Sequence, residues 1–274
     1  MKFKVGLCQM AGSSADDINI NKKETWMKAE AMIREAASAG CDMVSLPEMW
    51  NTPYANKYFR PFAETEDGPT VKKMGQLAEE LGIYLIGGTI SEIEGDNVYN
   101  TSYIYDRNGN IIGKHRKAHL FDIDVKGGIR FMESETLTQG DARTVVDTEF
   151  GRIGIGICFD VRFPDLFMRM ALDGVKMVFL PGAFNMTTGP VHWELAMRSR
   201  AVDNQVYFAA ISPARTEEGP YKAYGHSMVV TPWADIIAEA GSGEEIVYAE
   251  IDTEYVDSIR KQLPLLSARR PELY

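Results

Sequence analysis

The sequence lacks the features that direct a protein to a membrane, to nucleic acid or to an oxidising compartment. Its 274 residues contain no run of about 18 apolar residues, and the N-terminal segment lacks the long apolar stretch of a signal peptide. The formal net charge is −10, with no basic stripe for nucleic acid or an anionic membrane. The 3 cysteines show no paired spacing, which fits a reducing compartment. We therefore predict a soluble, cytoplasmic protein with no nucleic acid or membrane partner.

Metal-ligand spacing is absent as well. The histidines form no helical i, i+4 pair and no zinc knuckle with the cysteines; they are His115, His119, His192 and His226. We expect neither a metal nor an organic cofactor. A cysteine hydrolase without a Cys–His pair needs another base, and a carboxylate can serve if burial raises its pKa.

No linker, charge run or fixed-period repeat divides the chain, so we predict one domain over residues 1–274 with a large α/β core. Hydrophobic periodicity predicts helices over residues 21–39, 71–81, 164–173, 192–204 and 253–262. It predicts strands over residues 2–10, 42–46, 83–90, 99–105, 111–117, 152–158, 177–180, 206–212, 224–231, 236–240 and 245–251. This alternation indicates a mixed sheet system, either two packed sheets covered by helices or one large open sheet.

Three chemically useful residues follow or end predicted strands, where ligand sites of open α/β sheets lie. Glu48 comes just after residues 42–46, Lys117 ends residues 111–117, and Cys158 ends residues 152–158 before a helix opened by Pro164. At such a position, backbone N–H groups and the helix dipole favour a thiolate and an oxyanion. Most free cysteines are instead small buried hydrophobic residues, and the local sequence alone favours that interpretation of Cys158. A base, a cation and a nucleophile from three strand ends could nevertheless share one crevice.

Two further features complete the local interpretation. Cys8 and Cys41 lie in or beside apolar segments and are expected to be core residues without a chemical role. Residues 118–143 show little periodicity, and a loop of that length inside a compact domain is usually functional.

The motifs around these residues resemble those of a known family. They are Leu46-Pro47-Glu48, then His115-Arg116-Lys117-Ala118-His119-Leu120, and then Gly156-Ile157-Cys158-Phe159-Asp160-Val161-Arg162-Phe163. Their order and content resemble the nitrilase superfamily of carbon–nitrogen hydrolases over essentially the whole chain. The stretches HLFDIDVKGGIRFMESETLTQG, PGAFNMTTGPVHWELAMRSRAVDNQVYFAAISPAR and YGHSMVV resemble its omega-amidase branch.

This resemblance implies a four-layer α-β-β-α sandwich and a homodimer in which helices of two subunits pack together. It implies a Glu48, Lys117 and Cys158 triad, with Glu133 as a second glutamate that orients Lys117 or the substrate. The backbone N–H of Phe159 would complete the oxyanion hole. Phenylalanine stands there where many omega-amidases are expected to have tyrosine, so a hydroxyl contact to the substrate could be lost.

The resemblance also implies a reaction. The expected substrate is a small amide, the terminal amide of a short 2-oxo acid such as 2-oxoglutaramate or 2-oxosuccinamate, cleaved through a thioester on Cys158. An N-carbamoyl or other small-amide hydrolase on the same triad is the alternative, and a non-catalytic interaction protein or an acyltransferase fits less well. Arginine suits the substrate carboxylate, and Arg162 is the candidate substrate-binding residue beside Phe159, although it could instead hold the chain after Cys158. The other candidates near motif segments are Arg198, Arg200 and Arg215.

Overall fold

A computed structural model describes residues 1–15, 17–124, 126 and 130–273 of the chain. Part of the segment predicted to be functional, residues 125 and 127–129, lies outside the described residues. The helices are α1 (Ile18–Ser38), α2 (Asn56–Phe62), α3 (Pro69–Leu81), α4 (Pro164–Leu172), α5 (Gly189–Asn204) and α6 (Thr253–Gln262). Short 3-10 helices are η1 (Glu133–Glu135), η2 (Cys158–Arg162) and η3 (Pro271–Leu273).

Two large mixed sheets form the centre of the molecule. The first has the strand order β15 (Glu245–Asp252), β1 (Lys2–Gln9), β2 (Met43–Ser45), β3 (Tyr84–Ile86), β5 (Asn97–Tyr105) and β4 (Ile90–Glu94), and β6 (Ile111–Arg116) also pairs with β5. The second has the order β14 (Ile236–Glu239), β13 (Met228–Val230), β12 (Tyr207–Ile211), β11 (Val175–Pro181), β10 (Gly151–Ile155) and β9 (Thr144–Thr148). A separate hairpin consists of β7 (Asp122–Asp124) and β8 (Arg130–Met132).

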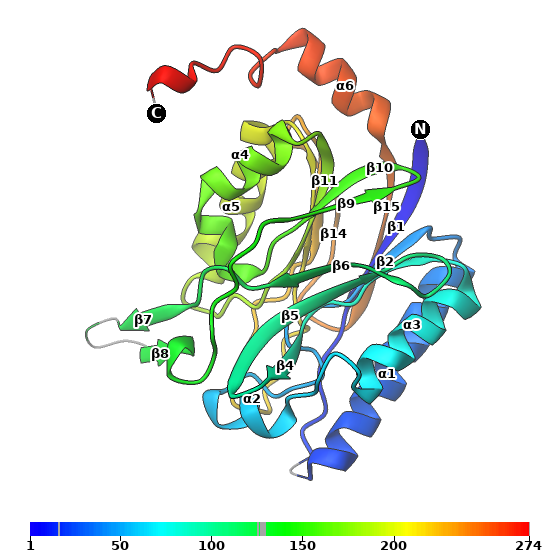
Figure 1. Ribbon diagram of the computed structural model, residues 1–274, viewed down its shortest axis with the longest axis vertical. Coiled ribbons are helices and arrows are strands. Elements are labelled where there is room, and N and C mark those ends of the chain that lie inside the picture. The colour runs from blue at the N-terminus through cyan, green and yellow to red at the C-terminus, as the bar shows by residue number, and fades with distance from the viewer. Residues whose placement is uncertain (16, 125, 127–129, 274) are drawn as a thin grey trace.

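Helices cover the outer face of each sheet, which gives the four-layer α-β-β-α sandwich (Figure 1). Val5 and Leu7 of β1 point into the core between the sheets, whereas Cys8 faces α1 and α3. On the other side, Phe167 of α4 and Trp193 of α5 pack on the second sheet. Both faces of the central strands are therefore buried, and this explains why they are apolar on both faces. The sandwich is confirmed, and the open-sheet alternative is wrong.

Most predicted helices and strands are present, with informative differences. The predicted strand over residues 83–90 is two strands, because the chain turns at Gly88, which has φ +58°. A Cβ at this position would collide with the carbonyl oxygen of Pro47. The turn lets Thr89 bond both sides of Glu48: its N–H donates to Pro47 O at 3.1 Å, and its hydroxyl accepts from Met49 N at 2.8 Å. A break in one strand thus holds the Glu48 segment in place.

Other elements escape the periodicity analysis because they are short. These are α2, β4, β9 and the β7–β8 hairpin. The predicted strand over residues 152–158 is too long: β10 ends at Ile155, and Cys158 begins η2 instead. None of the helices in the described part of the chain is both long and apolar enough to cross a membrane.

Candidate active site

Glu48 follows β2 and is held by donors from three distant segments. One oxygen, Oε2, accepts from the backbone N–H of Ala183 at 2.7 Å. The other, Oε1, accepts from Asn100 Nδ2 on β5 at 2.8 Å and from Lys117 Nζ at 3.0 Å. Only 1% of Glu48 is exposed, so these donors replace water around the carboxylate. The carboxylate is fixed in one orientation.

Lys117, directly after β6, lies between two carboxylates. Its Nζ is 3.0 Å from Glu48 Oε1 and 2.9 Å from Glu133 Oε1, and all three side chains are buried. Burial lowers the pKa of Lys117, but the charges of Glu133 and Glu48 outweigh it and raise the pKa well above the usual value. Burial together with Glu48 raises the pKa of Glu133, against the opposing effect of Lys117. The cluster thus keeps a permanent cation beside two competing carboxylates.

Tyr54 joins the two carboxylates from the side. Its hydroxyl is 2.6 Å from Glu133 Oε1 and 3.2 Å from Glu48 Oε1. The remaining oxygen of Glu133 accepts from the backbone N–H of Phe121 at 2.7 Å. Tyr54 and Asn100 are site residues that the sequence analysis missed, because nothing in their local sequence marks them. Tertiary packing alone brings them to Glu48.

Cys158 begins η2 with a left-handed backbone, φ +45°, which is strained for a residue with a side chain. It is buried, and the charges of Glu48, Lys117 and Glu133 act on its thiol. Burial, and then the charge of Glu48, raise its pKa well above the usual value. Both effects favour the thiol over the thiolate. Such a thiol needs a base to become a nucleophile.

Asp160 fixes the turn that contains Cys158. Its Oδ2 accepts from Ile157 N at 2.9 Å and lies 3.2 Å from His115 Nε2. Its Oδ1 accepts from His119 N at 3.0 Å and lies 2.8 Å from His119 Nδ1. Burial raises the pKa of Asp160, but the hydrogen bonds from His115 and His119 outweigh it and hold the pKa well below the usual range. One carboxylate thereby ties the segment that contains Cys158 to the strand end that carries Lys117.

The sequence analysis missed this role of Asp160. A signal was available, because histidines lie two positions on either side of Lys117 and an aspartate lies two positions after Cys158. In the described part of the chain, no group of three or more His, Cys, Asp or Glu side chains is placed to hold a metal.

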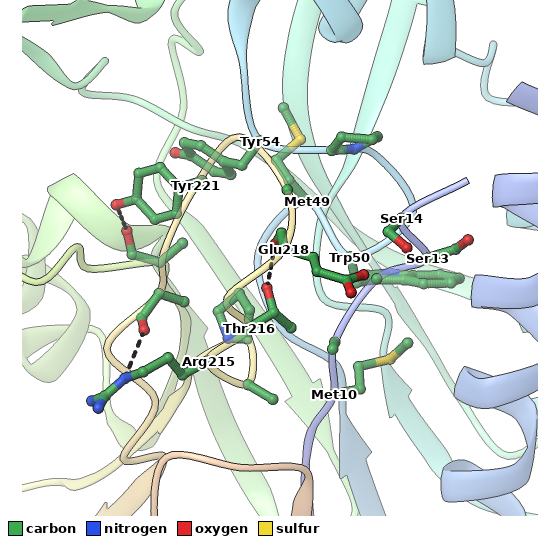
Figure 2. A pocket seen from close by; sticks show the side chains of 18 of the residues that line it. Met10, Ser13, Ser14, Met49, Trp50, Tyr54, Arg215, Thr216, Glu218 and Tyr221 are labelled. Atoms are coloured by element: carbon green, nitrogen blue, oxygen red, sulfur yellow. Dashed lines mark hydrogen bonds between the residues drawn. The ribbon is translucent and has the colours of Figure 1, made fainter. Parts of the chain in front are cut away.

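Two cavities meet at this site. The narrow cavity is lined by Phe121, Cys158, Phe159, Arg162, Ala183, Phe184, Thr188 and Tyr221. The wide cavity, about 530 Å³, borders Glu48 and Tyr54 and shares Ala183 and Tyr221 with the narrow one. In the view of Figure 2, Tyr54 and Tyr221 lie on one side of the wide cavity, Trp50, Ser13 and Ser14 lie on the other, and Thr216 and Glu218 lie between them.

Of the four candidate arginines, the structure places Arg162 beside Cys158. It lines the narrow cavity with Phe159, and its Nη2 lies 3.3 Å from His192 Nδ1. Arg215 lines the wide cavity instead and donates to Tyr224 O. The remaining two donate to backbone carbonyls elsewhere: Arg198 to Ala234 O and Arg200 to Val161 O.

Comparison with known proteins agrees with this geometry. The model of the carbon–nitrogen hydrolase family matches residues 4–261. The chain belongs to the carbon–nitrogen hydrolase family. This hydrolase is 48% identical over 273 residues to omega-amidase NIT2 of Xenopus tropicalis, covering 100% of this chain and 97% of that protein. It is 47% identical over 272 residues to omega-amidase NIT2 of Homo sapiens, covering 99% and 96%.

A solved structure extends the likeness to three dimensions. Nit3 of Saccharomyces cerevisiae, a member of branch 10 of the nitrilase superfamily, superposes with a TM-score of 0.89 at 45% identity, covering 98% of this chain and 97% of that one. Together, the family match and the full-length relatives show that this carbon–nitrogen hydrolase is an amidase of the nitrilase superfamily.

Proposed function

We propose that this amidase hydrolyses the terminal amide of short 2-oxo acid amides, 2-oxoglutaramate and 2-oxosuccinamate, to the 2-oxo dicarboxylate and ammonia. The observation that carries the proposal is the buried Lys117 between Glu48 and Glu133, with the thiol of Cys158 inside their electrostatic field. Full-length relatives that are omega-amidases support this substrate class.

Acylation begins at the thiol. Glu48 takes the proton of Cys158 as sulfur attacks the amide carbon, and Lys117 with the backbone N–H of Phe159 stabilises the oxyanion. Glu48 then gives the proton to the departing nitrogen, which leaves as ammonia with formation of a thioester. Glu133 and Tyr54 hold Lys117 and Glu48 in position through the hydrogen bonds described above.

Deacylation uses the same carboxylate. Glu48 takes a proton from water as the water oxygen attacks the thioester carbon, and Lys117 again stabilises the oxyanion. The intermediate collapses with cleavage of the carbon–sulfur bond, and the sulfur of Cys158 regains a proton from Glu48. A neutral resting thiol fits this cycle, because the proton is returned after each turnover.

Arg162 is the proposed partner of the substrate carboxylate. It lines the narrow cavity next to Cys158 and Thr188, and its guanidinium lies 5.8 Å from the centre of the Phe159 ring. Guanidinium binds a carboxylate through two parallel hydrogen bonds, which suits recognition of a short acid. A plain amide leaves this cation unsatisfied, at a cost of about 1–3 kcal/mol or more.

The test compares ammonia release from 2-oxoglutaramate, a short aliphatic amide and an N-carbamoyl compound, with Cys158→Ala as the blank. We expect selectivity of about a hundredfold or more in kcat/KM for the 2-oxo acid amide over the aliphatic amide. Arg162→Met should raise KM for 2-oxoglutaramate and leave the slow aliphatic reaction nearly unchanged, whereas the control Arg198→Met should change neither. Equal efficiency on all three substrates would remove the assignment, and preference for the N-carbamoyl compound would replace it.

We also propose that the protein is a homodimer that pairs through α5. Val191 and Leu195 lie four positions apart on this helix and are 62% and 65% exposed. Trp233, in the turn between β13 and β14, is 51% exposed. Exposed apolar side chains in a patch are typical of protein interfaces. Light scattering should find a dimer for the wild type and a monomer for Leu195→Glu. Met27→Glu on α1, 59% exposed, is the control that should stay dimeric.

A further inference from the structure

One residue of β5 contacts Glu48 with its side chain and Lys117 with its backbone. Asn100 Nδ2 donates to Glu48 Oε1 at 2.8 Å, and Asn100 O accepts from the backbone N–H of Lys117 at 2.8 Å. On the opposite edge of β5, Asn100 pairs with Ser91 of β4. Because its backbone is held on both edges, Asn100 sets the spacing between the Glu48 carboxylate and the Lys117 segment.

The side chain of Asn100 is fully buried, and packing does not explain why it is an amide. Asn100 is 0% exposed and lines neither cavity. No donor among the described residues reaches its Oδ1. An unsatisfied buried acceptor lowers stability, so packing alone would favour an apolar residue at this position. The reason for an amide therefore lies in the hydrogen bond to Glu48.

The two oxygens of Glu48 differ in the donors that surround them. An ionised carboxylate oxygen accepts about two hydrogen bonds. Oε1 receives one from Asn100 Nδ2 at 2.8 Å and one from Lys117 Nζ at 3.0 Å. Among the described residues, Oε2 receives one, from the backbone N–H of Ala183 at 2.7 Å. Oε1 is therefore filled, whereas Oε2 keeps a free acceptor position.

The hydroxyl of Tyr54 does not change this difference. It lies 3.2 Å from Glu48 Oε1 but 2.6 Å from Glu133 Oε1. A hydroxyl has one proton to donate, and the shorter contact is to Glu133. The acceptor positions of Oε1 are therefore occupied by Asn100 and Lys117.

The free acceptor position belongs to the oxygen nearer to the Cys158 segment. Ala183, the donor to Oε2, lines the narrow cavity together with Cys158. The preceding residue, Gly182, packs so closely on this segment that a Cβ there would lie 3.2 Å from Cys158 Cα. Oε1 is bonded instead to Asn100 and Lys117, at the ends of the neighbouring strands. Oε2 is thus the oxygen that is both free and on the side of the thiol.

We propose that Asn100 is a positioning residue, which occupies one acceptor position of Glu48 Oε1 and so presents Oε2 to the thiol of Cys158. The inference rests on the proposed role of Glu48 as the base. As sulfur attacks the amide carbon, the S–H bond of Cys158 breaks and an O–H bond forms at Oε2. The same proton then passes from Oε2 to the departing nitrogen. Without the donor from Asn100, Oε1 competes for the proton and the carboxylate is less firmly oriented.

Asn100→Leu tests the proposal, because it removes the donor and keeps a side chain of similar size. We expect kcat to fall about tenfold or more. KM should stay within about twofold, because Asn100 lines neither cavity. A purely structural role would lower the amount of folded protein and leave kcat per folded molecule unchanged.

The pH profile of kcat/KM is a second measurement on the same variant. Its acid limb should move to higher pH by about one unit, because the ionised form of Glu48 loses a donor while the proton-bound form loses less. The titratable groups around Glu48 are unchanged in this variant: Lys117, Glu133, Tyr54, Tyr221 and Cys158. Alkylation of Cys158 by iodoacetamide, located by mass spectrometry, should slow in proportion to kcat, because it also needs removal of the thiol proton.

Asn204 of α5 offers a matched control. It is 1% exposed, its Nδ2 donates to Arg200 O at 2.8 Å, and its Oδ1 also lacks a partner among the described residues. Asn204→Leu therefore removes the same kind of buried donor away from Glu48. It should keep kcat, the pH profile and the alkylation rate within about twofold of the wild type. Asn100→Ala removes the same donor and is used if Asn100→Leu does not fold.

Failure of this inference differs from failure of the proposed function. Wild-type turnover in Glu48→Gln would remove the proposed base, and the role of Asn100 with it. If Glu48→Gln is inactive but Asn100→Leu keeps the turnover and pH profile of Asn204→Leu, only the role of Asn100 is overturned. A higher KM with unchanged kcat also overturns it, as does the loss of folding in both Asn100 variants while Asn204→Leu folds.

Discussion

Two neighbouring charge clusters at the end of β6 combine cations and carboxylates in opposite proportions. In the first, the carboxylate of Glu92 lies between two cations: Arg116 Nη2 is 2.7 Å and Lys114 Nζ is 2.5 Å from its Oε1. In the second, the cation of Lys117 lies between two carboxylates, at 3.0 Å from Glu48 and 2.9 Å from Glu133. Glu92 is 1% exposed, as is Glu48.

The proportions determine what each cluster can do. Burial raises the pKa of Glu92, but hydrogen bonds from Arg116, Lys114 and Thr101 outweigh it and lower the pKa to about 2. That carboxylate is ionised at any physiological pH and accepts no proton. Around Lys117, one cation serves two carboxylates, and the pKa of Glu133 is raised. An excess of cations therefore makes a structural pair, and an excess of carboxylates makes a site that can exchange protons.

Removing Glu48, the proposed base, should have the largest effect. Glu48→Gln keeps the shape but cannot accept the proton of Cys158, so kcat should fall about 10²–10⁴-fold. The variant should still fold, because Lys117 keeps Glu133, although its melting temperature should fall because the amide NH2 replaces an oxygen that accepts from buried donors. Steady-state kinetics with thermal unfolding checks both. A stable variant that retains wild-type turnover would mean that the two clusters do not differ in function.

The structural cluster should give the opposite result. Glu92→Gln should lower the free energy of unfolding by about 3 kcal/mol, the low end for a broken buried ion pair, because Lys114 keeps Glu66 and Arg116 keeps Glu94. Turnover per folded molecule should stay within about twofold. Urea unfolding measures the first quantity, with the exposed Glu94→Gln as control. A large loss of kcat without loss of stability would contradict the comparison.

The same cluster predicts a pH dependence of stability. The pKa of Glu92 is lower in the folded protein than the ordinary value of 4.5, so its contribution is fully present above about pH 4.5 and is lost as the pH falls toward about 2. Wild type should therefore lose more stability than Glu92→Gln over this range. If the free energy of unfolding falls equally in the two proteins between pH 5 and 2.5, Glu92 is not the group responsible for this pH dependence.

Asp160 connects the second cluster to Cys158, the proposed nucleophile, and its replacement should have a smaller effect. Asp160→Asn removes a charged acceptor from Ile157 N, His115 and His119 and lets Cys158 shift relative to Lys117, so kcat should fall about 10–100-fold with little change in KM. His119→Asn, which keeps a donor near the position of Nδ1, should retain more activity than His119→Leu. If both His119 variants lose activity equally, the hydrogen bond does not position the nucleophile.

The thiols outside both clusters should matter least. Burial raises the pKa of Cys41 to about 11 and that of Cys8 further, so both are protonated and unreactive near neutral pH. Replacing both with alanine should leave turnover within several-fold, as is usual for residues that contact neither substrate nor reacting atoms. Activity normalised to folded protein is the measurement. A near-total loss in a well-folded double variant would assign one of these thiols to the reaction.

The helices and strands were largely predictable, because the periodicity that specifies them is local. Residues 21–39 and 253–262, for example, correspond to α1 and α6 within a few positions. The turn at Gly88 and the early end of β10 were not predicted, because apolar residues continue through both. The backbone conformation there depends on contacts with residues distant in sequence, such as Pro47 O beside Gly88. Periodicity could not distinguish two packed sheets from one open sheet, since both arrangements bury the same residues.

The sequence by itself determined the order of the elements and the chemical identity of Glu48, Lys117 and Cys158 at or near strand ends. Only the tertiary structure decided which charges meet. The partners of Glu48 are Lys117 and Ala183, 69 and 135 residues away in the chain. A charge interaction depends on the distance and on the medium between the groups, and neither is set until the two sheets pack and exclude water. That is why Arg116 stabilises the fold, whereas the adjacent Lys117 lies among the groups proposed to act on the substrate.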